Sequence, residues 1–265
     1  PERIREMKTP TELNLRALHE FPMVQSGDDL AALVYEGFNH EGSPLQAGDV
    51  IALAQKIVSK AEGRLVKLSS VTASERAQTL AEQVDKDPRV VELILSESVD
   101  VVRAINGVLI TENRYGLVMA NAGLDMSNVE HDDPIEDDTA LLLPIDPDAT
   151  ARAIRASLER RVGGHIGVIV CDSVGRAWRE CTVGLAIGVS GLPARLDLRG
   201  DHDLYGRELK VSEVALGDSL AAAASVLMGE RDEGRPVVRI RGAGIEGTDG
   251  SARDVVRPRE RDLFR

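Results

Sequence analysis

The spacing of apolar side chains along the chain predicts helices and strands in interleaved order. Leu30, Leu33, Val34 and Phe38 recur with the period of a helix, and residues 26–29 can cap its N-terminus. Similar patterns predict helices at residues 73–86, 88–94, 148–161 and 211–228. Short continuous apolar runs predict buried strands at residues 50–54, 165–171 and 236–240.

A β-hairpin is the clearest local prediction in the sequence. Asn106-Gly107 separates apolar runs at residues 101–105 and 108–111, and this dipeptide favours a tight hairpin turn. Residues 115–120 are expected to continue the same sheet. Because hairpins and helices are interleaved without regular strand–helix alternation, the sequence predicts an α+β fold with mixed or antiparallel sheets.

Length and composition place bounds on the architecture. The chain has 265 residues, of which 43% are hydrophobic, so it can bury a sizeable core. Residues 1–19 are polar and are expected to form an irregular lead-in. Residues 20–265 are expected to form one unit, either undivided or built from two intertwined subdomains.

The charge and the scarce aromatic residues exclude several classes of partner. The net charge is −12, which argues against binding to nucleic acid duplexes. Three Phe, three Tyr and one Trp are too few for a platform that stacks single-stranded bases. The sequence contains no apolar run long enough to span a membrane and no apolar segment typical of a secretion signal. With two cysteines, the expected location is a reducing cytoplasm.

Familiar nucleotide and metal motifs are missing or misleading. The chain has no G-x-x-x-x-G-K-S/T phosphate loop and no H-x-x-x-H or H-E-x-x-H pair. Residues 242–247 match G-x-G-x-x-G, but the sequence that follows does not predict a dinucleotide-binding unit. The acidic segment around His131 is better explained as a solvated loop than as a metal site.

Three acids stand where predicted strands or helices end. Asp125 follows a strand, Asp172 ends another beside the hydroxyl of Ser173, and Glu230 follows the last long helix. Carboxylates at the ends of rigid elements suit Mg²⁺ or Mn²⁺, which prefer oxygen ligands. For any one acid taken alone, helix capping or a solvated loop is the favoured explanation, and the metal interpretation rests on the three together.

Basic residues are placed near these acids. Lys56 and Lys60 interrupt an apolar stretch, and in a helix their spacing puts them on one face. Arg176 and Arg179 follow Asp172. Arginine suits bidentate recognition of carboxylate or phosphate. Acids for a metal and bases for phosphates together suggest nucleotide-dependent chemistry.

Several separated motifs resemble the coenzyme F420-0:L-glutamate ligase family. They extend in one order over residues 20–265. The matching segments are Lys56 to Arg64, Gly116 to Val129, Leu142 to Ala149, Asp172 to Arg179, Ala186 to Val189, Asp203 to Leu209 and Arg257 to Arg265.

The resemblance implies an enzyme and its substrates. Members form an amide between the terminal carboxylate of a deazaflavin precursor, coenzyme F420-0, and L-glutamate, and they cleave GTP to GDP and phosphate. It also implies an unusual α+β fold, a homodimer, a requirement for Mg²⁺ or Mn²⁺, and help from K⁺. The matching motifs cover the ligase unit alone, so the flavin-type second domain of some fused members is not expected here.

The resemblance also implies roles for particular residues. Lys60, Arg176 and Asp172 are expected to take part in catalysis. The metal ligands would be Asp125, Asp172, Ser173 and Glu230. The GTP contacts would be Phe21, Pro22, Met23, Val24, Gln55, Lys60 and Asn128.

Departures from the family pattern leave alternatives open. Phe21 and Gln55 stand where Leu and Ser are common, Ser173 replaces a frequent Thr, and Gly184 replaces a frequent Asp. The alternatives are a ligase that uses a different acceptor and a non-catalytic nucleotide-binding protein. The sequence does not specify the number of glutamates added, the preferred metal or the role of His202.

Overall fold

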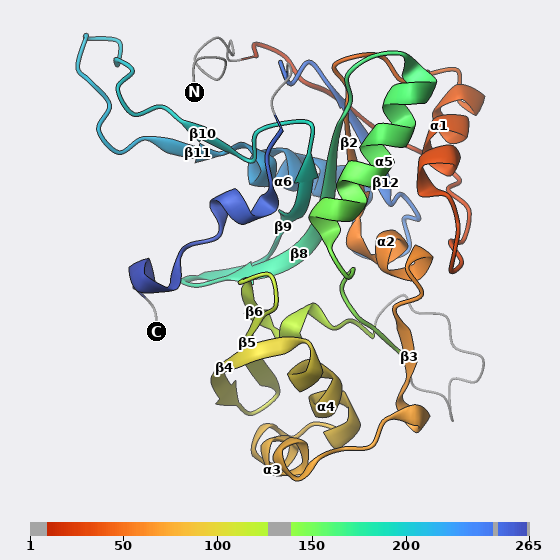
Figure 1. Cartoon of the computed structure of the whole chain (residues 1–265), viewed down its shortest axis with the longest axis vertical. Helices are drawn as coiled ribbons and strands as arrows, with labels where there is room; N and C mark the ends of the chain where they lie inside the picture. The colour runs from red at the N-terminus through yellow and green to blue at the C-terminus, as the bar shows by residue number, and fades with distance from the viewer. Residues whose placement is uncertain (1–9, 127–138, 246–248, 264–265) are drawn as a thin grey trace.

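A mixed five-stranded sheet forms the centre of the larger part of the molecule, here called the sheet lobe (Figure 1). The computed structural model describes residues 10–126, 139–245 and 249–263. The strand order is β1-β12-β2-β8-β9, and among these strands only β2 and β8 pair in parallel. The strands are β1 (Asn14–Ala17), β2 (Val50–Ala54), β8 (Gly167–Arg176), β9 (Arg179–Ser190) and β12 (Val237–Arg241).

Helices cover both faces of this sheet, as expected for the central strand β2, which is apolar at every position. Ile51 and Leu53 face α1 (Leu30–His40) and α5 (Pro147–Val162). Val50 and Ala52 face α6 (Leu216–Met228) on the opposite side. The alternation of side chains along β2 thus divides the core into two layers.

A small lobe lies below the sheet lobe in Figure 1. Its core contains Ala77, Val84, Val91, Ile94 and Leu109. The predicted hairpin is confirmed, with Gly107 at a positive φ of 82° in the turn. The small lobe comprises α3 (Glu75–Val84), α4 (Pro88–Ser96), β4 (Ser98–Ile105), β5 (Val108–Asn113), β6 (Val118–Ala120) and the 3₁₀ turn η3 (Asn121–Gly123).

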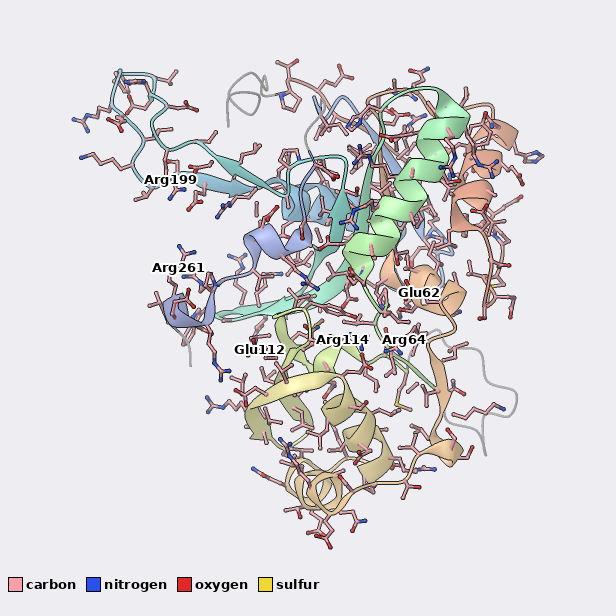
Figure 2. The ribbon with its side chains drawn as sticks, in the orientation of Figure 1. Glu62, Arg64, Glu112, Arg114, Arg199 and Arg261 are labelled. Carbon is pink, nitrogen blue, oxygen red and sulfur yellow. The ribbon has the colours of Figure 1, made fainter. Side chains whose placement is uncertain are left out.

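The chain crosses between the lobes in both directions through two paired strands, β3 (Leu65–Lys67) and β7 (Thr139–Leu141). The short helix α2 (Gln55–Ala61) precedes β3, and the 3₁₀ turn η2 (Leu68–Ser70) follows it. Figure 2 shows Arg64 and Arg114 close together at this junction. The C-terminal segment carries two further 3₁₀ turns, η4 (Ala252–Val255) and η5 (Arg259–Arg261).

An arm formed by β10 (Arg195–Asp197) and β11 (Glu213–Ala215) projects from the sheet lobe (Figure 1). Within the described residues, no helix combines the length and apolarity needed to cross a bilayer. The predicted α+β class with mixed sheets is confirmed.

Several predicted boundaries were wrong. Residues 14–17 form β1, although an irregular lead-in was expected, because their backbone completes the sheet edge beside β12. The helix predicted from residue 148 begins at Pro147 and is capped by Asp146, while the Asp148 carboxylate accepts the backbone N–H of Val189. The helix predicted from residue 211 begins at Leu216, after β11.

Candidate functional site

A cavity of about 610 Å³ opens beside the carboxyl ends of the parallel strands β2 and β8. Such an edge is where ligands commonly bind in sheets with parallel strands. The pairing of β2 with β8 ends at Ala54 and Cys171, and the cavity begins there. Its walls come from α2, the β8–β9 hairpin, and the loop between α6 and β12.

Helix α2 follows β2 without an intervening loop, and this arrangement places both lysines of the helix on the cavity wall. Lys56 and Lys60 line the cavity, as their spacing predicted. Gln55 lines it too, although its side chain is buried and its amide oxygen accepts the hydroxyl of Ser59 at 2.9 Å. The polar residues that interrupt the apolar run therefore face a ligand-sized space.

Asp125 reaches the cavity through an unusual backbone turn. Asn121, Ala122 and Gly123 all have positive φ values, of 52°, 54° and 76°. Non-glycine residues adopt this conformation at an energetic cost, and such costs cluster at functional sites. The backbone of Asp125 is then fixed by two hydrogen bonds to Leu141. Its carboxylate contacts the Lys56 ammonium at 2.7 Å.

Asp172 and Ser173 lie on β8 directly after its last contact with β2. The sequence predicted that the strand ends at Asp172, which was wrong, because β8 continues to Arg176 by pairing with β9 alone. The Ser173 backbone N–H donates to the Asp172 carboxylate at 2.9 Å, and the Ser173 hydroxyl donates to Glu230 at 2.5 Å. Both acids and the hydroxyl line the cavity.

The carboxylates of this site act on one another electrostatically. Burial raises the pKa of the Asp172 carboxyl to about 7. The backbone N–H of Ser173 and the charge of Lys56 oppose this rise in pKa, whereas the charges of Asp125 and Glu230 add to it. Clustered carboxylates raise one another's pKa in this way until a cation offsets their charge. We call Asp125, Asp172 and Glu230 the acid cluster.

The donor set suits a hard divalent cation. Carboxylates and a hydroxyl are oxygen ligands of the type that Mg²⁺ and Mn²⁺ prefer. Within the described part of the chain, no three His, Cys, Asp or Glu side chains are arranged to enclose one ion. An ion here would therefore share its coordination with water or substrate oxygens, as Mg²⁺ usually does.

The structure brings together many of the predicted site residues, but not all of them. Of the segment 21–24, Met23 lines the cavity, while the Val24 side chain is buried in the core. Arg176 lies farther along β8 and is absent from the cavity lining. Asn128 falls outside the described residues. The nucleotide-contact and catalytic roles of these residues stay predictions.

Sequence reasoning missed part of the cavity wall. Arg231 and Arg235 line it from the loop between α6 and β12, and this loop turns at Gly229 and Gly234, which have positive φ values. In the sequence, this loop could have been recognised from the two glycines that flank its charged residues. Lys56 was singled out only for its spacing, yet it is the residue that contacts Asp125.

Cys171 and Gly184 line the cavity for structural reasons. Burial raises the pKa of the Cys171 thiol far above its ordinary value, so this cysteine is not a nucleophile at neutral pH. A Cβ atom on Gly184 would lie 2.8 Å from the carbonyl oxygen of Ala221 on α6. Gly184 thus allows α6 to pack closely against β9.

Comparisons with known proteins find a family and relatives that match most of the chain. Residues 19–242 match the family model described as F420-0:Gamma-glutamyl ligase. The coenzyme F420:L-glutamate ligase of Methanothermobacter thermautotrophicus is 44% identical over 255 residues, which cover 96% of this chain and 99% of that protein. The protein of the same name from Methanopyrus kandleri is 48% identical over 246 residues, 91% of this chain and 93% of the relative. That of Methanocaldococcus jannaschii is 42% identical over 248 residues, 93% and 94% of the two chains.

Proposed function

The chain belongs to the F420-0:gamma-glutamyl ligase family, and we propose that it joins L-glutamate to the terminal carboxylate of coenzyme F420-0 while cleaving GTP to GDP and phosphate. The observation that carries this proposal is the cavity, where an acid cluster and four basic side chains meet at the carboxyl ends of β2 and β8. This combination of charges suits a triphosphate and a divalent cation.

The proposed reaction requires the acceptor carboxylate to be activated. A carboxylate is a poor acyl donor because its leaving group would be oxide. Transfer of the γ-phosphoryl group of GTP to the carboxylate gives an acyl phosphate and GDP. The amine of L-glutamate then attacks the acyl carbon, and phosphate leaves. Most of the catalysis in such a sequence comes from positioning and from neutralising charge.

Basic side chains would neutralise the phosphoryl group during its transfer. Lys60 and Arg235 both line the cavity. Lys56 also lines the cavity, and its ammonium contacts the Asp125 carboxylate at 2.7 Å. We assign Lys60 to the triphosphate and Lys56 to the orientation of Asp125. Arg176 does not line the cavity, so its catalytic role rests on the family resemblance alone.

Oxygen ligands for Mg²⁺ or Mn²⁺ are available in Asp125, Asp172, Ser173 and Glu230. When bound, the divalent ion would offset phosphate charge and polarise the phosphoryl oxygens. The hydrogen bond from the Ser173 hydroxyl holds Glu230 in place against β8. K⁺ is proposed as an accessory ion by family resemblance, without an assigned ligand set.

A ligase with a different acceptor is the second candidate, and it rests on one observation. Thr182 and Gly184 line the part of the cavity along β9, and Gly184, which packs closely against α6, lacks the charged side chain that is frequent at this position in the family. A purely nucleotide-binding role is less well supported, because all members of the acid cluster are present together with both lysines of α2.

Incubation of the purified protein with substrates tests the proposal directly. With deglutamylated coenzyme F420-0, L-glutamate, GTP and Mg²⁺ or Mn²⁺, mass spectrometry should detect the coenzyme with one or more added glutamates. We expect GTP to support turnover and ATP to support it poorly. Equal specific activity with the two nucleotides would contradict the nucleotide assignment, and an unmodified coenzyme would contradict the function.

The exposed arm supports a proposal for assembly. Leu204 and Tyr205 on the segment between β10 and β11 are 99% and 91% exposed, and exposed apolar side chains of this kind favour association. We expect a two-fold dimer, with light scattering giving about twice the chain mass of 28.6 kDa at micromolar concentration.

A matched pair of variants tests the role of the arm in this assembly. Leu204→Asp should increase the monomer fraction, while Val99→Asp, at an exposed position on the small lobe, should not. A wild-type protein that is monomeric at every concentration tested would contradict the dimer.

A further inference from the structure

The β8–β9 hairpin continues past the acid cluster to an exposed tip. Beyond Cys171, the residues of β8 pair with β9 as far as the pair Arg176 and Arg179. Trp178 in the tip is 84% exposed and has a positive φ of 64°. An indole is the largest apolar side chain, and the hairpin turn holds this one out toward solvent in a conformation that non-glycine residues rarely adopt.

One face of this hairpin forms an open path from the cavity toward the tip. Ser173 pairs with Gly184, and Gly175 pairs with Thr182. Ser173, Gly184 and Thr182 line the cavity. A Cβ atom placed on Gly175 would meet no atom of the described residues within 4 Å. The space beside Gly184 is filled by α6, but Gly175 and the short side chain of Thr182 leave space for a ligand to extend along the outer part of the hairpin.

The outer hairpin also carries positive charge. Arg176 and Arg179 are paired across its last register position. The Nη1 atom of Arg176 is buried and lacks a hydrogen-bond acceptor among the residues that the structure describes. A buried N–H group without an acceptor is costly, so such a group is often completed by a ligand or water. The tip thus combines an aromatic face with guanidinium groups that suit an anion.

We infer that the outer half of the β8–β9 hairpin, with Trp178 at its tip, binds the aromatic end of the acceptor. This inference rests on the proposed function, in which the reacting carboxylate lies at the acid cluster. Strand residues are spaced by about 3.4 Å, so Arg176 lies roughly 10 Å beyond Ser173. An elongated acceptor with a planar deazaflavin at one end and its carboxylate at the other matches this arrangement.

Tryptophan fluorescence tests the inference without requiring turnover. Trp178 is the only tryptophan in the chain, so emission from the protein reports on this position alone. Titration with deglutamylated coenzyme F420-0, in the absence of GTP and glutamate, should quench the emission in a saturable manner. GTP alone should leave it unchanged. The inference would be overturned if adding the coenzyme left the emission unchanged. If the emission per molecule then varied with protein concentration, a second copy of the chain would cover the tip.

Steady-state kinetics test whether the contact positions the acceptor. Trp178→Ala should raise KM for the coenzyme about 10-fold, within the range for loss of one aromatic stacking contact. kcat and KM for GTP should change little, because the contact is made in both the ground state and the transition state. Trp178→Phe should restore much of the loss. Val99→Ala, which alters an exposed apolar residue on the small lobe, serves as the control.

These measurements separate the inference from the proposed function. A wild-type enzyme that makes the amide bond, with an unchanged KM for the coenzyme in Trp178→Ala, would overturn the role of Trp178 and leave the ligase activity standing. If the wild-type protein forms no amide bond but the coenzyme still quenches its fluorescence, the proposed ligase function is contradicted. The inferred binding site for the deazaflavin ring would then still stand.

Discussion

Replacement of Asp172 by Asn should reduce turnover by about 10²-fold or more at saturating Mg²⁺ or Mn²⁺. Asn keeps the shape of the side chain but removes the charge that would offset a divalent ion. Asp172 lies within the acid cluster, and its carboxylate is held by the Ser173 backbone N–H. Asp125→Asn should have a similar effect, with the added loss of the ion pair to Lys56.

The same Asp172→Asn substitution should stabilise the metal-free protein. The pKa of Asp172 is raised to about 7, so the folded state binds this proton more tightly than the unfolded state does. The free energy of unfolding of the wild type should therefore fall as the pH rises from about 4 to about 7. Asp172→Asn removes that dependence. Its melting temperature should exceed that of the wild type at pH 8, and the difference should shrink toward pH 4.

A carboxylate with a capping role gives the matched control. Asp146 caps α5 by accepting the backbone N–H of Ala149, and Asn is also a good cap. Asp146→Asn should leave the turnover rate and the melting temperature near those of the wild type. If Asp172→Asn behaved in the same way, with near-normal turnover, the metal-ligand assignment would be rejected. A large fall in its melting temperature would instead make Asp172 a structural residue.

Local patterns in the sequence predicted much of the fold and part of the site. The period of apolar residues located α1, and Asp87-Pro88 located the start of α4. The i,i+4 spacing of Lys56 and Lys60 predicted their shared face. These features depend on neighbours along the chain, which is why sequence reasoning could find them.

Features that depend on distant pairing were missed. β1 forms because residues 14–17 meet β12 at the sheet edge. β8 extends past Asp172 because the twelve-residue strand β9 returns beside it, in a region where the apolar pattern predicted no strand. The contact between Lys56 and Asp125 joins segments from the two lobes, and neither segment carries a local signal for the other.

The junction between the lobes depends on one carboxylate that is largely, though not fully, removed from solvent. Glu97 caps the end of α4 in the small lobe, and its side chain is 11% exposed. It contacts Arg64 at 2.8 Å and Arg114 at 2.9 Å. The same two arginines donate hydrogen bonds to the carbonyl groups of Leu143 and Pro144, where the chain returns to the sheet lobe. Arg64 and Arg114 are adjacent in Figure 2.

Glu97→Gln should therefore destabilise the protein by about 3 kcal/mol, near the lower end for breaking a buried ion pair, since Arg114 is partly exposed. For a chain of this size, that change lowers the melting temperature by roughly 6–12 °C. The cause is that two guanidinium groups lose their shared counter-charge, and that of Arg64, whose side chain is 18% exposed, stays largely desolvated. Asp100→Asn, which removes an exposed ion pair with Arg259, should cost less than about 1 kcal/mol. Equal melting temperatures for the two variants would show that the Glu97 contacts do not hold the lobes together.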